Sequence, residues 1–237
     1  MARLSPRRPG CYDSRILELR AGELTEILKG EGLLCERGGR PVFARLHFAL
    51  APGSALVLKG PNGSGKSSLL RLCAGLIRPS AGRLLRGGRP VDHDPDGHRA
   101  DLRYMGHLPA LKPALTLRRN LEHWAMLYGV GDPVARVEAA LSRVRLGTLA
   151  DLPARLLSAG QQRRAAIARL LLQPASLWLM DEPTVGLDAR SLDDLTRLMA
   201  EHVEAGGAIM VATHQPLDLP SMQDLDLSAF RPEEAFT

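Results

Sequence analysis

The sequence predicts an α/β protein with a doubly wound parallel sheet, an antiparallel β layer ahead of it and a helical insertion within it. Two observations support this prediction. An apolar run at residues 55–58 precedes a glycine-rich loop, and apolar residues at helical spacing follow that loop. Later apolar runs at 102–105, 176–181 and 208–213 alternate with helical patterns and end in polar residues. This pattern is typical of sheets that hold ligands at the carboxyl ends of their strands.

The glycine-rich loop fits G-x-x-x-x-G-K-[ST], the pattern of a nucleotide phosphate-binding loop. Its glycines permit backbone torsions that a Cβ would block, so successive amides and the start of the next helix can point at phosphates. We expect Lys66 to reach the β- and γ-phosphates and the Ser67 hydroxyl to ligate Mg²⁺. The predicted phosphate-binding residues are Gly60, Pro61, Asn62, Gly63, Ser64, Gly65, Lys66 and Ser67.

The chain ahead of the loop divides into an extension and a β-rich stretch. Residues 1–26 are rich in proline and arginine, which is typical of a disordered extension, so we expect the folded domain over 27–237. Short apolar runs between residues 33 and 50, broken by glycine and proline turns, predict the antiparallel layer. His47 alternates with the apolar residues of the last run and is expected to face solvent.

The stretch at residues 91–99 carries His93 and His98 among aspartates. It shows no regular metal-ligand spacing, so we expect a surface loop there.

Residues 116–172 are rich in helical patterns. Apolar stripes over 117–128 and 134–144 predict two helices, and Ser158 is placed to cap a third that ends at Leu172. We therefore expect a helical subdomain over about residues 107–172. An amphipathic pattern over 191–205 predicts the helix that precedes the strand at 208–213.

Charge and composition restrict the partners. The net charge is +5, but the arginines are spread along the chain and few aromatic residues are present to stack bases, so no nucleic-acid partner is expected. Three scattered cysteines without a C-x-x-C pair predict reduced thiols in a reducing compartment. No apolar run approaches the ~20 residues that cross a bilayer, so we expect any membrane role to depend on a partner.

Five short motifs follow one another along the chain. They are the loop at 60–67, Gly106-His107, Leu157-Ser-Ala-Gly-Gln-Gln162, the apolar run ending in Asp181-Glu182-Pro183, and Thr213-His214. This ordered set resembles the ATP-binding cassette (ABC) ATPases over about residues 27–215.

That resemblance implies a P-loop NTPase cassette that hydrolyses ATP with Mg²⁺. It implies that Asp181 holds Mg²⁺ through water, that Glu182 is the catalytic carboxylate that orients the attacking water, and that His214 contacts the γ-phosphate. Asp188 matches the loop that crosses between subunits.

The resemblance also implies a homodimer of cassettes. Ser158, Gly160 and Gln161 match the signature loop, which in this family closes on the γ-phosphate of ATP held by a second cassette, again through a helix N-terminus. Ala159 replaces the first glycine of that loop, so this position must tolerate a methyl group. Two copies head to tail would enclose two ATP molecules.

Two positions depart from the family pattern. His107 stands where the family has a glutamine that interacts with Mg²⁺ and water, and imidazole can take that place with one pH-sensitive group. This substitution predicts slow or differently coupled hydrolysis. No aromatic residue stands at the usual adenine-stacking position near residues 36–38, and Arg37 and Phe43 are the candidates for that contact.

Further details narrow the resemblance to the cytochrome c biogenesis ATP-binding export proteins, the CcmA family. They are Gly106-His107, Leu111-Lys112, Leu115-Thr116, Asn120-Leu121, the run Leu157 to Arg164, Thr213-His-Gln-Pro216 and the opening Leu33-Leu-Cys-Glu-Arg37. Membership would imply the ATPase subunit of a bacterial haem exporter, at the cytoplasmic face of the inner membrane, whose hydrolysis releases a haem-loaded chaperone.

The partners that this narrower resemblance implies are a CcmB-like membrane permease subunit with CcmC- and CcmE-like proteins. Residues 108–113 are expected to line the groove that receives the permease. The alternatives are an ABC ATPase of a transporter with a different cargo and a soluble nucleic-acid-associated ABC ATPase.

Overall fold

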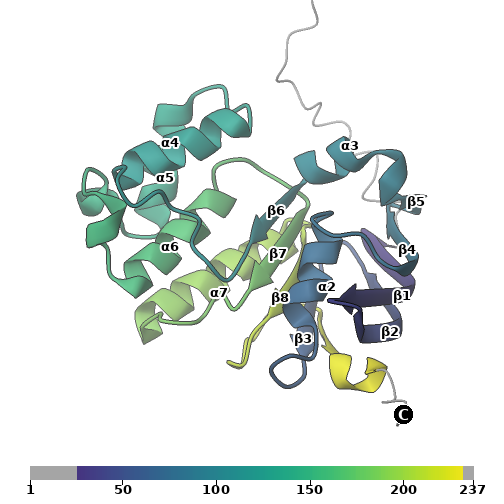
Figure 1. The fold of residues 1–237 in the computed structure, drawn as a ribbon. Coiled ribbons are helices and arrows are strands. Elements are labelled where there is room, and N and C mark those ends of the chain that lie inside the picture. The colour runs from purple at the N-terminus through teal and green to yellow at the C-terminus, as the bar shows by residue number, and fades with distance from the viewer. Residues whose placement is uncertain (1–25, 232–237) are drawn as a thin grey trace, which may run out of the picture.

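The computed structural model describes residues 26–231, which form two packed sheets and the helices around them (Figure 1). The predicted extension over 1–26 lies outside the described residues except for its last residue. The first sheet is antiparallel in the order β2-β1-β4-β5. Its strands are β1 (Leu28–Arg37), β2 (Arg40–Leu50), β4 (Ala81–Arg86) and β5 (Arg89–Pro90).

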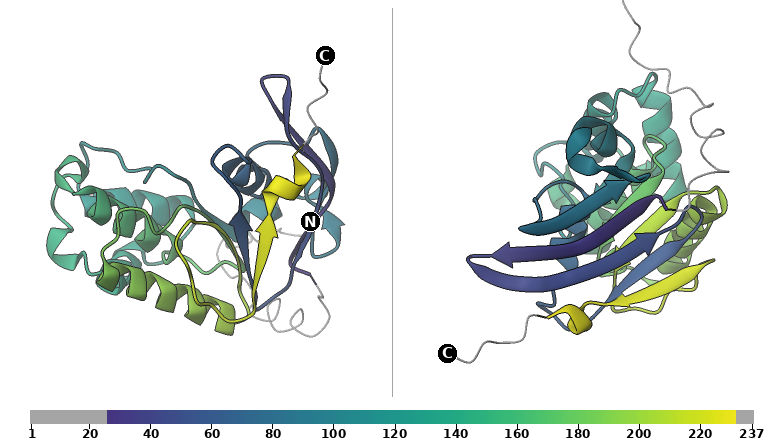
Figure 2. Two further views of the ribbon diagram at one scale, coloured as in Figure 1. Left: turned by 90° about the horizontal axis from the view of Figure 1, so that it is seen from below. Right: turned by 90° about the vertical axis from the view of Figure 1, so that its right-hand side faces the viewer.

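The long hairpin of β1 and β2 forms the outer layer that the sequence predicts, and Figure 2 shows the two strands side by side. In β2 the side chains of Leu46, Phe48 and Leu50 are buried while His47 is exposed, which confirms the predicted alternation. The Gly32 amide donates to Nδ1 of His47 at 3.3 Å across the hairpin.

The second sheet is parallel, in the order β6-β7-β8-β3-β9. Its strands are β3 (Ala55–Lys59), β6 (Leu102–Met105), β7 (Leu177–Asp181), β8 (Ala208–Ala212) and β9 (Met222–Asp226). The edge strand β9 was not expected, because its residues are mostly polar and exposed and lack the apolar run of a buried strand. It pairs with β3 from Ala55–Met222 to Lys59–Asp226.

Alternate residues of the parallel strands enter two different cores. In β3, Leu56 and Leu58 pack with α2 (Lys66–Cys73) and the antiparallel sheet, so α2 is sandwiched between the two sheets. Ala55 and Val57 face the opposite core, which α7 (Ala189–Glu204) covers with Leu195, Leu198 and Met199. The parallel sheet is thus covered on both faces, as a parallel sheet requires.

The remaining long helices gather at one end of the molecule, away from the antiparallel sheet (Figure 1). They are α4 (Leu117–Leu127), α5 (Pro133–Arg143) and α6 (Ala159–Leu170). Ser158 caps α6 as predicted: its hydroxyl accepts from the Gln161 amide, and the Gln161 side chain accepts from the Ser158 amide. Across residues 26–231, no helix combines the length and the apolar character that crossing a bilayer demands.

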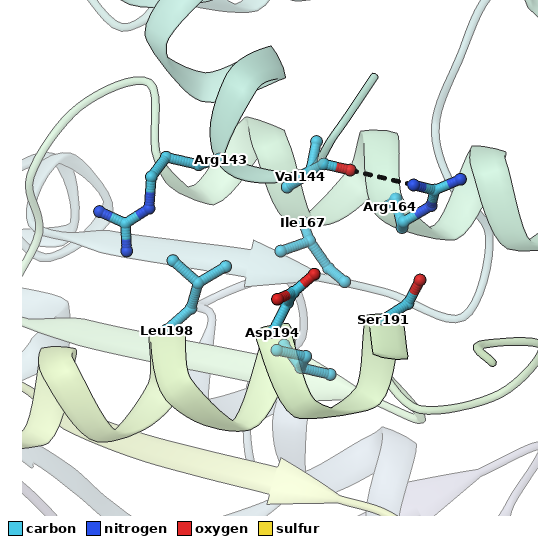
Figure 3. Close-up of a pocket in the computed structure, with 8 residues that line it drawn as sticks. Arg143, Val144, Arg164, Ile167, Ser191, Asp194 and Leu198 are labelled. Atoms are coloured by element: carbon cyan, nitrogen blue, oxygen red, sulfur yellow. Dashed lines mark hydrogen bonds between the residues drawn. The ribbon is translucent and has the colours of Figure 1, made fainter. Parts of the chain in front are cut away.

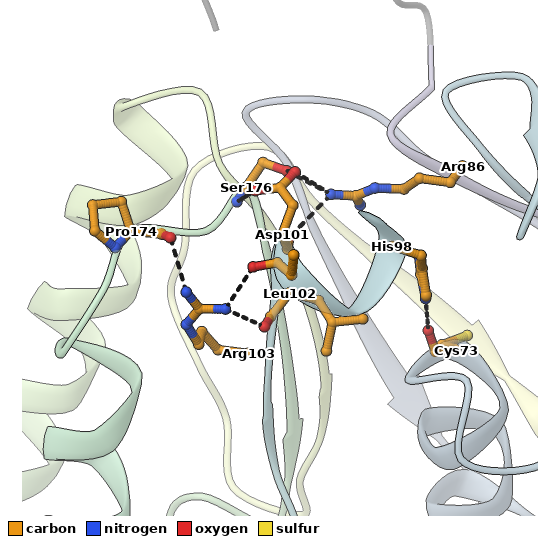
Figure 4. Close-up of polar contacts among 9 residues, drawn as sticks. Cys73, Arg86, His98, Asp101, Leu102, Arg103, Pro174 and Ser176 are labelled. Carbon is orange, nitrogen blue, oxygen red and sulfur yellow. Dashed lines mark hydrogen bonds and ion pairs between the residues drawn. The ribbon is translucent and has the colours of Figure 1, made fainter. Parts of the chain in front are cut away.

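The prediction of a surface loop over residues 91–99 is wrong. This stretch forms a 3₁₀ helix at Val91–His93 and a short helix α3 (Pro95–Ala100), where the Asp94 side chain accepts from the Gly97 amide as the N-cap. His98 is buried, and its Nε2 lies 2.8 Å from the Cys73 carbonyl oxygen at the end of α2 (Figure 4). The Asp-Pro pair is a helix-start signal, and His98 is buried because α3 packs on α2.

Candidate functional site

Four predicted motifs lie at one edge of the parallel sheet. The loop 60–67 follows β3, His107 follows β6, Asp181 ends β7 and His214 follows β8. The strand register sets Asp181 opposite Ala212, and Ala212 opposite Leu58. The carboxyl ends of three neighbouring strands are therefore level, and the residues that follow them meet at the position where doubly wound sheets hold ligands.

The loop between β3 and α2 depends on its glycines. Gly60, Gly63 and Gly65 have φ values of 126°, 80° and 100°, which side chains with a Cβ rarely adopt. The Lys66 amine, in a residue that is 8% exposed, donates to the carbonyl oxygens of Gly60 at 2.7 Å and Pro61 at 3.1 Å. These two bonds fold the Lys66 side chain from the start of α2 back across the loop.

Asp181 and Ser67 join the end of β7 to the start of α2. Asp181 is 2% exposed, and its Oδ1 accepts from the Ser67 hydroxyl at 3.0 Å. Its Oδ2 is also buried and has no hydrogen-bond partner among residues 26–231. A buried carboxylate oxygen without a partner is costly, and a cation or a cation-bound water would satisfy it.

Glu182 has a strained backbone next to this pair. Its φ of 51° is unusual for a residue with a side chain. The Glu182 amide donates to the Ala212 carbonyl oxygen at 2.8 Å, and the hydroxyls of Thr184 and Thr213 bond at 2.8 Å just beyond. These bonds tie the chain after β7 to the chain after β8, where Nε2 of His214 lies 3.4 Å from the Glu182 carboxylate.

The phosphate loop, His107 and the two carboxylates surround a cavity of about 380 Å³, and His214 is not among its lining residues. It is lined by Val42, Asn62, Gly63, Gly65, Lys66, Ser67, Ser68, His107, Asp181 and Glu182. The structure thus brings most of the predicted loop together with His107 and both carboxylates. Gly60, Pro61 and Ser64 belong to the same loop but do not line the cavity.

The predicted signature residues stand apart from this cavity. Ser158, Gly160 and Gln161 form the start of α6, and none of them lines it. Gly160 packs closely against the loop after β7: a Cβ at this position would lie only 2.6 Å from the Gly186 carbonyl oxygen. Asp188 in that loop caps α7 through the Ser191 amide, and its hydrogen bonds from Ser191 lower the pKa of its carboxyl.

A second hollow lies between α5, α6 and α7 (Figure 3). Its volume of about 10 Å³ holds no more than a single water molecule. Ion pairs Arg143–Glu201 and Arg145–Asp194 lie around it. It is therefore a packing gap, and the cavity at the sheet edge is the candidate site.

The structure changes one prediction at the site and adds one residue to it. Phe43 is fully buried in the core beneath the loop, so its ring has no free face for an adenine, and Arg37, which is exposed, stays as the candidate. Arg163 was not predicted. It is 7% exposed, and its Nη1 and Nη2 donate to the carbonyl oxygens of Gly106 at 3.4 Å and His107 at 3.1 Å. Burial lowers the Arg163 pKa, while the charges of Asp181 and Glu182 raise it.

Comparisons with known proteins place this geometry in a family. The family model described as ABC transporter matches residues 43–185. The chain is 53% identical over 211 residues to the cytochrome c biogenesis ATP-binding export protein CcmA of Rhodospirillum rubrum, covering 89% of this chain and 90% of that protein. It is 49% identical over 205 residues to the protein of the same name from Paramagnetospirillum magneticum, covering 84% and 93%.

A solved structure titled "Structure of ATP binding subunit of ABC transporter" superposes with a TM-score of 0.72 at 28% identity, covering 79% of each chain. The predicted fold class, with its antiparallel layer and helical insertion, is confirmed. So is the resemblance inferred from the five motifs.

Proposed function

Because this chain belongs to the ABC transporter family, as a CcmA-like ATP-binding protein, we propose that it is the ATP-hydrolysing subunit of an exporter for haem in cytochrome c biogenesis. The observation that carries the proposal is the cavity at the sheet edge, where a phosphate-binding loop meets two carboxylates. The names of the relatives supply the pathway, cytochrome c biogenesis, and the role in export, while haem as the cargo comes from the family resemblance.

ATP binds with its phosphates on the loop 60–67. The amides of the loop and of the first turn of α2 supply an anion site, and Lys66 adds a positive charge beside it. Arg37, exposed at the end of β1, supplies the contact to the adenine.

Mg²⁺ fits the residues beside the loop. Ser67 and Asp181 offer hydroxyl and carboxylate oxygens, the ligand type that Mg²⁺ prefers, and the buried Oδ2 of Asp181 has no protein partner within residues 26–231. When bound, Mg²⁺ neutralises the phosphate charge that grows during transfer. The chain itself places the two ligands, Asp181 at the end of β7 and Ser67 at the start of α2.

Hydrolysis requires a water molecule aligned with the γ-phosphate. Glu182 accepts a hydrogen bond from that water and orients it, and its backbone is held at the end of β7 because its amide donates a hydrogen bond to the Ala212 carbonyl oxygen. His214 contacts the γ-phosphate from the end of β8, and His107 approaches from the end of β6. Ser158, Gly160 and Gln161 of a second copy close the other side, which makes the working unit a homodimer.

The membrane partner is a permease subunit of the CcmB type, with CcmC- and CcmE-like proteins in the same complex. The chain then lies at the cytoplasmic face of the inner membrane, and hydrolysis drives release of the haem-loaded chaperone. Within the predicted docking segment 108–113, Leu108 follows β6 and is 76% exposed, so its side chain is available for contact with the permease.

Two variants test the ATPase proposal. Lys66→Ala should abolish or strongly weaken binding of a fluorescent ATP analogue, because it removes the charge behind the loop. Glu182→Gln should bind the analogue with wild-type affinity and lose about 100-fold or more in turnover. Turnover undiminished in Glu182→Gln would refute the assigned role.

Co-purification of haem-handling membrane proteins with the full chain tests the cargo, and a different permease would overturn it.

A further inference from the structure

Arg163 carries a charge into the interior, behind the cavity. It lies in the first half of α6 and is 7% exposed. Its two terminal nitrogens donate to consecutive carbonyl oxygens, those of Gly106 and His107, at 3.4 and 3.1 Å. Both carbonyls belong to the segment that leaves β6, and His107 lines the cavity.

These two buried hydrogen bonds hold the segment more firmly than an ordinary surface contact would. A buried guanidinium keeps its charge and must find acceptors, since a charge buried without partners costs far more than a neutral group. Its planar fork matches two neighbouring carbonyl oxygens at once, which a lysine ammonium cannot copy with the same geometry. The segment at residues 106–107 is outside regular secondary structure, so these two bonds fix a part of the chain that no sheet ladder holds.

A second arginine of the same helix strengthens the connection. Arg169 donates through Nη2 to the Tyr104 carbonyl oxygen at 2.8 Å, and its guanidinium stacks 4.5 Å above the Trp124 ring of α4. Two arginines of α6 thus hold three carbonyl oxygens between residues 104 and 107. A shift of α6 must either carry this segment with it or break charge-assisted bonds in a buried place.

We infer that Arg163 is a positioning residue: by holding the Gly106 and His107 carbonyls it sets His107 against the nucleotide cavity and couples it to the start of α6. The inference rests on the proposed function, because it gives His107 a role toward bound nucleotide. The first turn of α6 then carries the residues proposed to contact the ATP of the second copy. One turn later, Arg163 of the same helix holds the segment that lines the cavity of its own copy. A movement of the start of α6 would therefore move His107, and a movement of His107 would move the start of α6.

The first test observes His107 directly. Histidine ring signals are recorded by NMR on the full chain with isotope-labelled histidine, and His107 is assigned by its loss in His107→Gln. In Arg163→Gln, without nucleotide, the His107 signal should move by more than its line width. Arg164→Gln is the matched control, since Arg164 is the next residue of α6 but donates to the Val144 carbonyl oxygen at 3.2 Å (Figure 3) and to the Arg145 carbonyl oxygen at 3.3 Å. In that control the signal should stay in place.

The second test separates positioning from structural damage. Arg163→Gln should bind ATP within about threefold of the wild type, because the loop 60–67 is untouched, and should lose about tenfold in kcat. In His107→Ala that loss should vanish, so the double variant Arg163→Gln, His107→Ala should turn over ATP like His107→Ala alone. Multiplying losses in the double variant would overturn the inference, because Arg163 would then act without His107.

The outcomes distinguish this inference from the function it rests on. If the wild type binds no ATP, the proposed function fails, while the nucleotide-free NMR comparison still decides whether Arg163 holds His107. An unchanged His107 signal in a folded Arg163→Gln protein overturns the inference even if ATP is bound and hydrolysed. If Arg163→Gln does not fold, Arg163→Lys replaces it, and the His107 signal should still shift because one ammonium cannot reproduce the fork.

Discussion

At the scale of single residues, the packing at Gly65 shows how closely the phosphate loop and the antiparallel sheet approach each other. The residue has a φ of 100° at the N-cap of α2. A Cβ built there would lie 2.7 Å from Cγ1 of Val42 and 2.9 Å from Cδ1 of Phe43. The loop therefore lies directly on β2, and the buried ring of Phe43 supports it from below.

Gly65→Ala should consequently lower both stability and ATP affinity. The left-handed backbone costs an alanine about 1–2 kcal/mol, and the clash with β2 adds to it. Gly38→Ala is the control, because Gly38 has a φ of 56° in a hairpin turn with no atom within 4 Å of the added Cβ. Denaturant unfolding of the two variants measures the difference. Equal losses would show that contact with β2 contributes nothing.

Sequence and structure agree on single residues where a local motif specifies them. Lys66, Ser67 and Asp181 meet at the sheet edge because the motif and the alternation of strands and helices dictate it. Arg163 escaped notice because its partner carbonyl lies 56 positions away along the chain. The sequence does not reveal that Phe43 is buried, because its burial depends on the register of β2 on β1. A short apolar pair of residues does not specify that register, and Phe43 therefore remained among the candidates for the adenine contact.

At the scale of elements, one carboxylate joins the two sheets. Asp101 lies between α3 and β6, and its side chain accepts from the Ser176 amide at 2.9 Å, from the Ser176 hydroxyl and from Arg86 of β4 at 2.8 Å (Figure 4). Arg86 also donates to the Ser176 hydroxyl at 2.6 Å. This network connects the antiparallel sheet to the start of β7.

Replacing Asp101 by Asn should destabilise the protein by about 1–3 kcal/mol, because charge-assisted bonds to a half-buried arginine are lost. Asp96→Asn is the matched control in α3: its side chain is 94% exposed and it forms an ion pair with Arg99 one turn away, so the loss in stability should stay below about 0.5 kcal/mol. The midpoints of denaturant unfolding of the two variants make the comparison. Similar midpoints would mean that the two sheets hold together without this network.

The elements that the sequence did not predict share a physical cause. Strand β9 is an edge strand whose side chains are mostly exposed, so its residues carry no apolar alternation. Helix α3 has only six residues, too few for a helical stripe to stand out from the polar pattern. Both owe their form to neighbouring elements, β3 for the strand and α2 for the helix. The long apolar strands and the capped helices α4, α5 and α6 need no such help and were predicted.

At the scale of the whole molecule, each of the two cores contains a histidine at its border. His98 bonds to α2 in the core between the sheets, and burial lowers its pKa. His202 of α7 stacks on Trp178 of β7 in the other core, with ring centroids 4.1 Å apart, and burial lowers its pKa to about 4. Both rings are therefore neutral in the folded protein at neutral pH.

This arrangement makes the fold sensitive to mild acid. A histidine whose pKa is lower in the folded state than its unfolded value of about 6.5 binds protons preferentially when unfolded, so its stabilising effect is present above that pH and is lost as the pH falls. For His202, with a folded pKa of about 4, the loss between pH 7.5 and 5 is roughly 2 kcal/mol. His98 adds a loss in the same direction.

His202→Phe should remove the His202 part of that dependence while keeping a flat ring on Trp178. The free energy of unfolding, measured in denaturant at pH 7.5, 6.5 and 5, should fall less steeply in this variant than in the wild type. His93→Asn, at an exposed histidine, controls for the loss of one histidine from the chain. Parallel curves for wild type and His202→Phe would show that the pKa of His202 does not differ between the folded and unfolded states. The two histidines lie in different cores, so the reductions in pH dependence caused by His98→Gln and by His202→Phe should add up in the double variant. Reductions that do not add up would mean that acid opens both cores together.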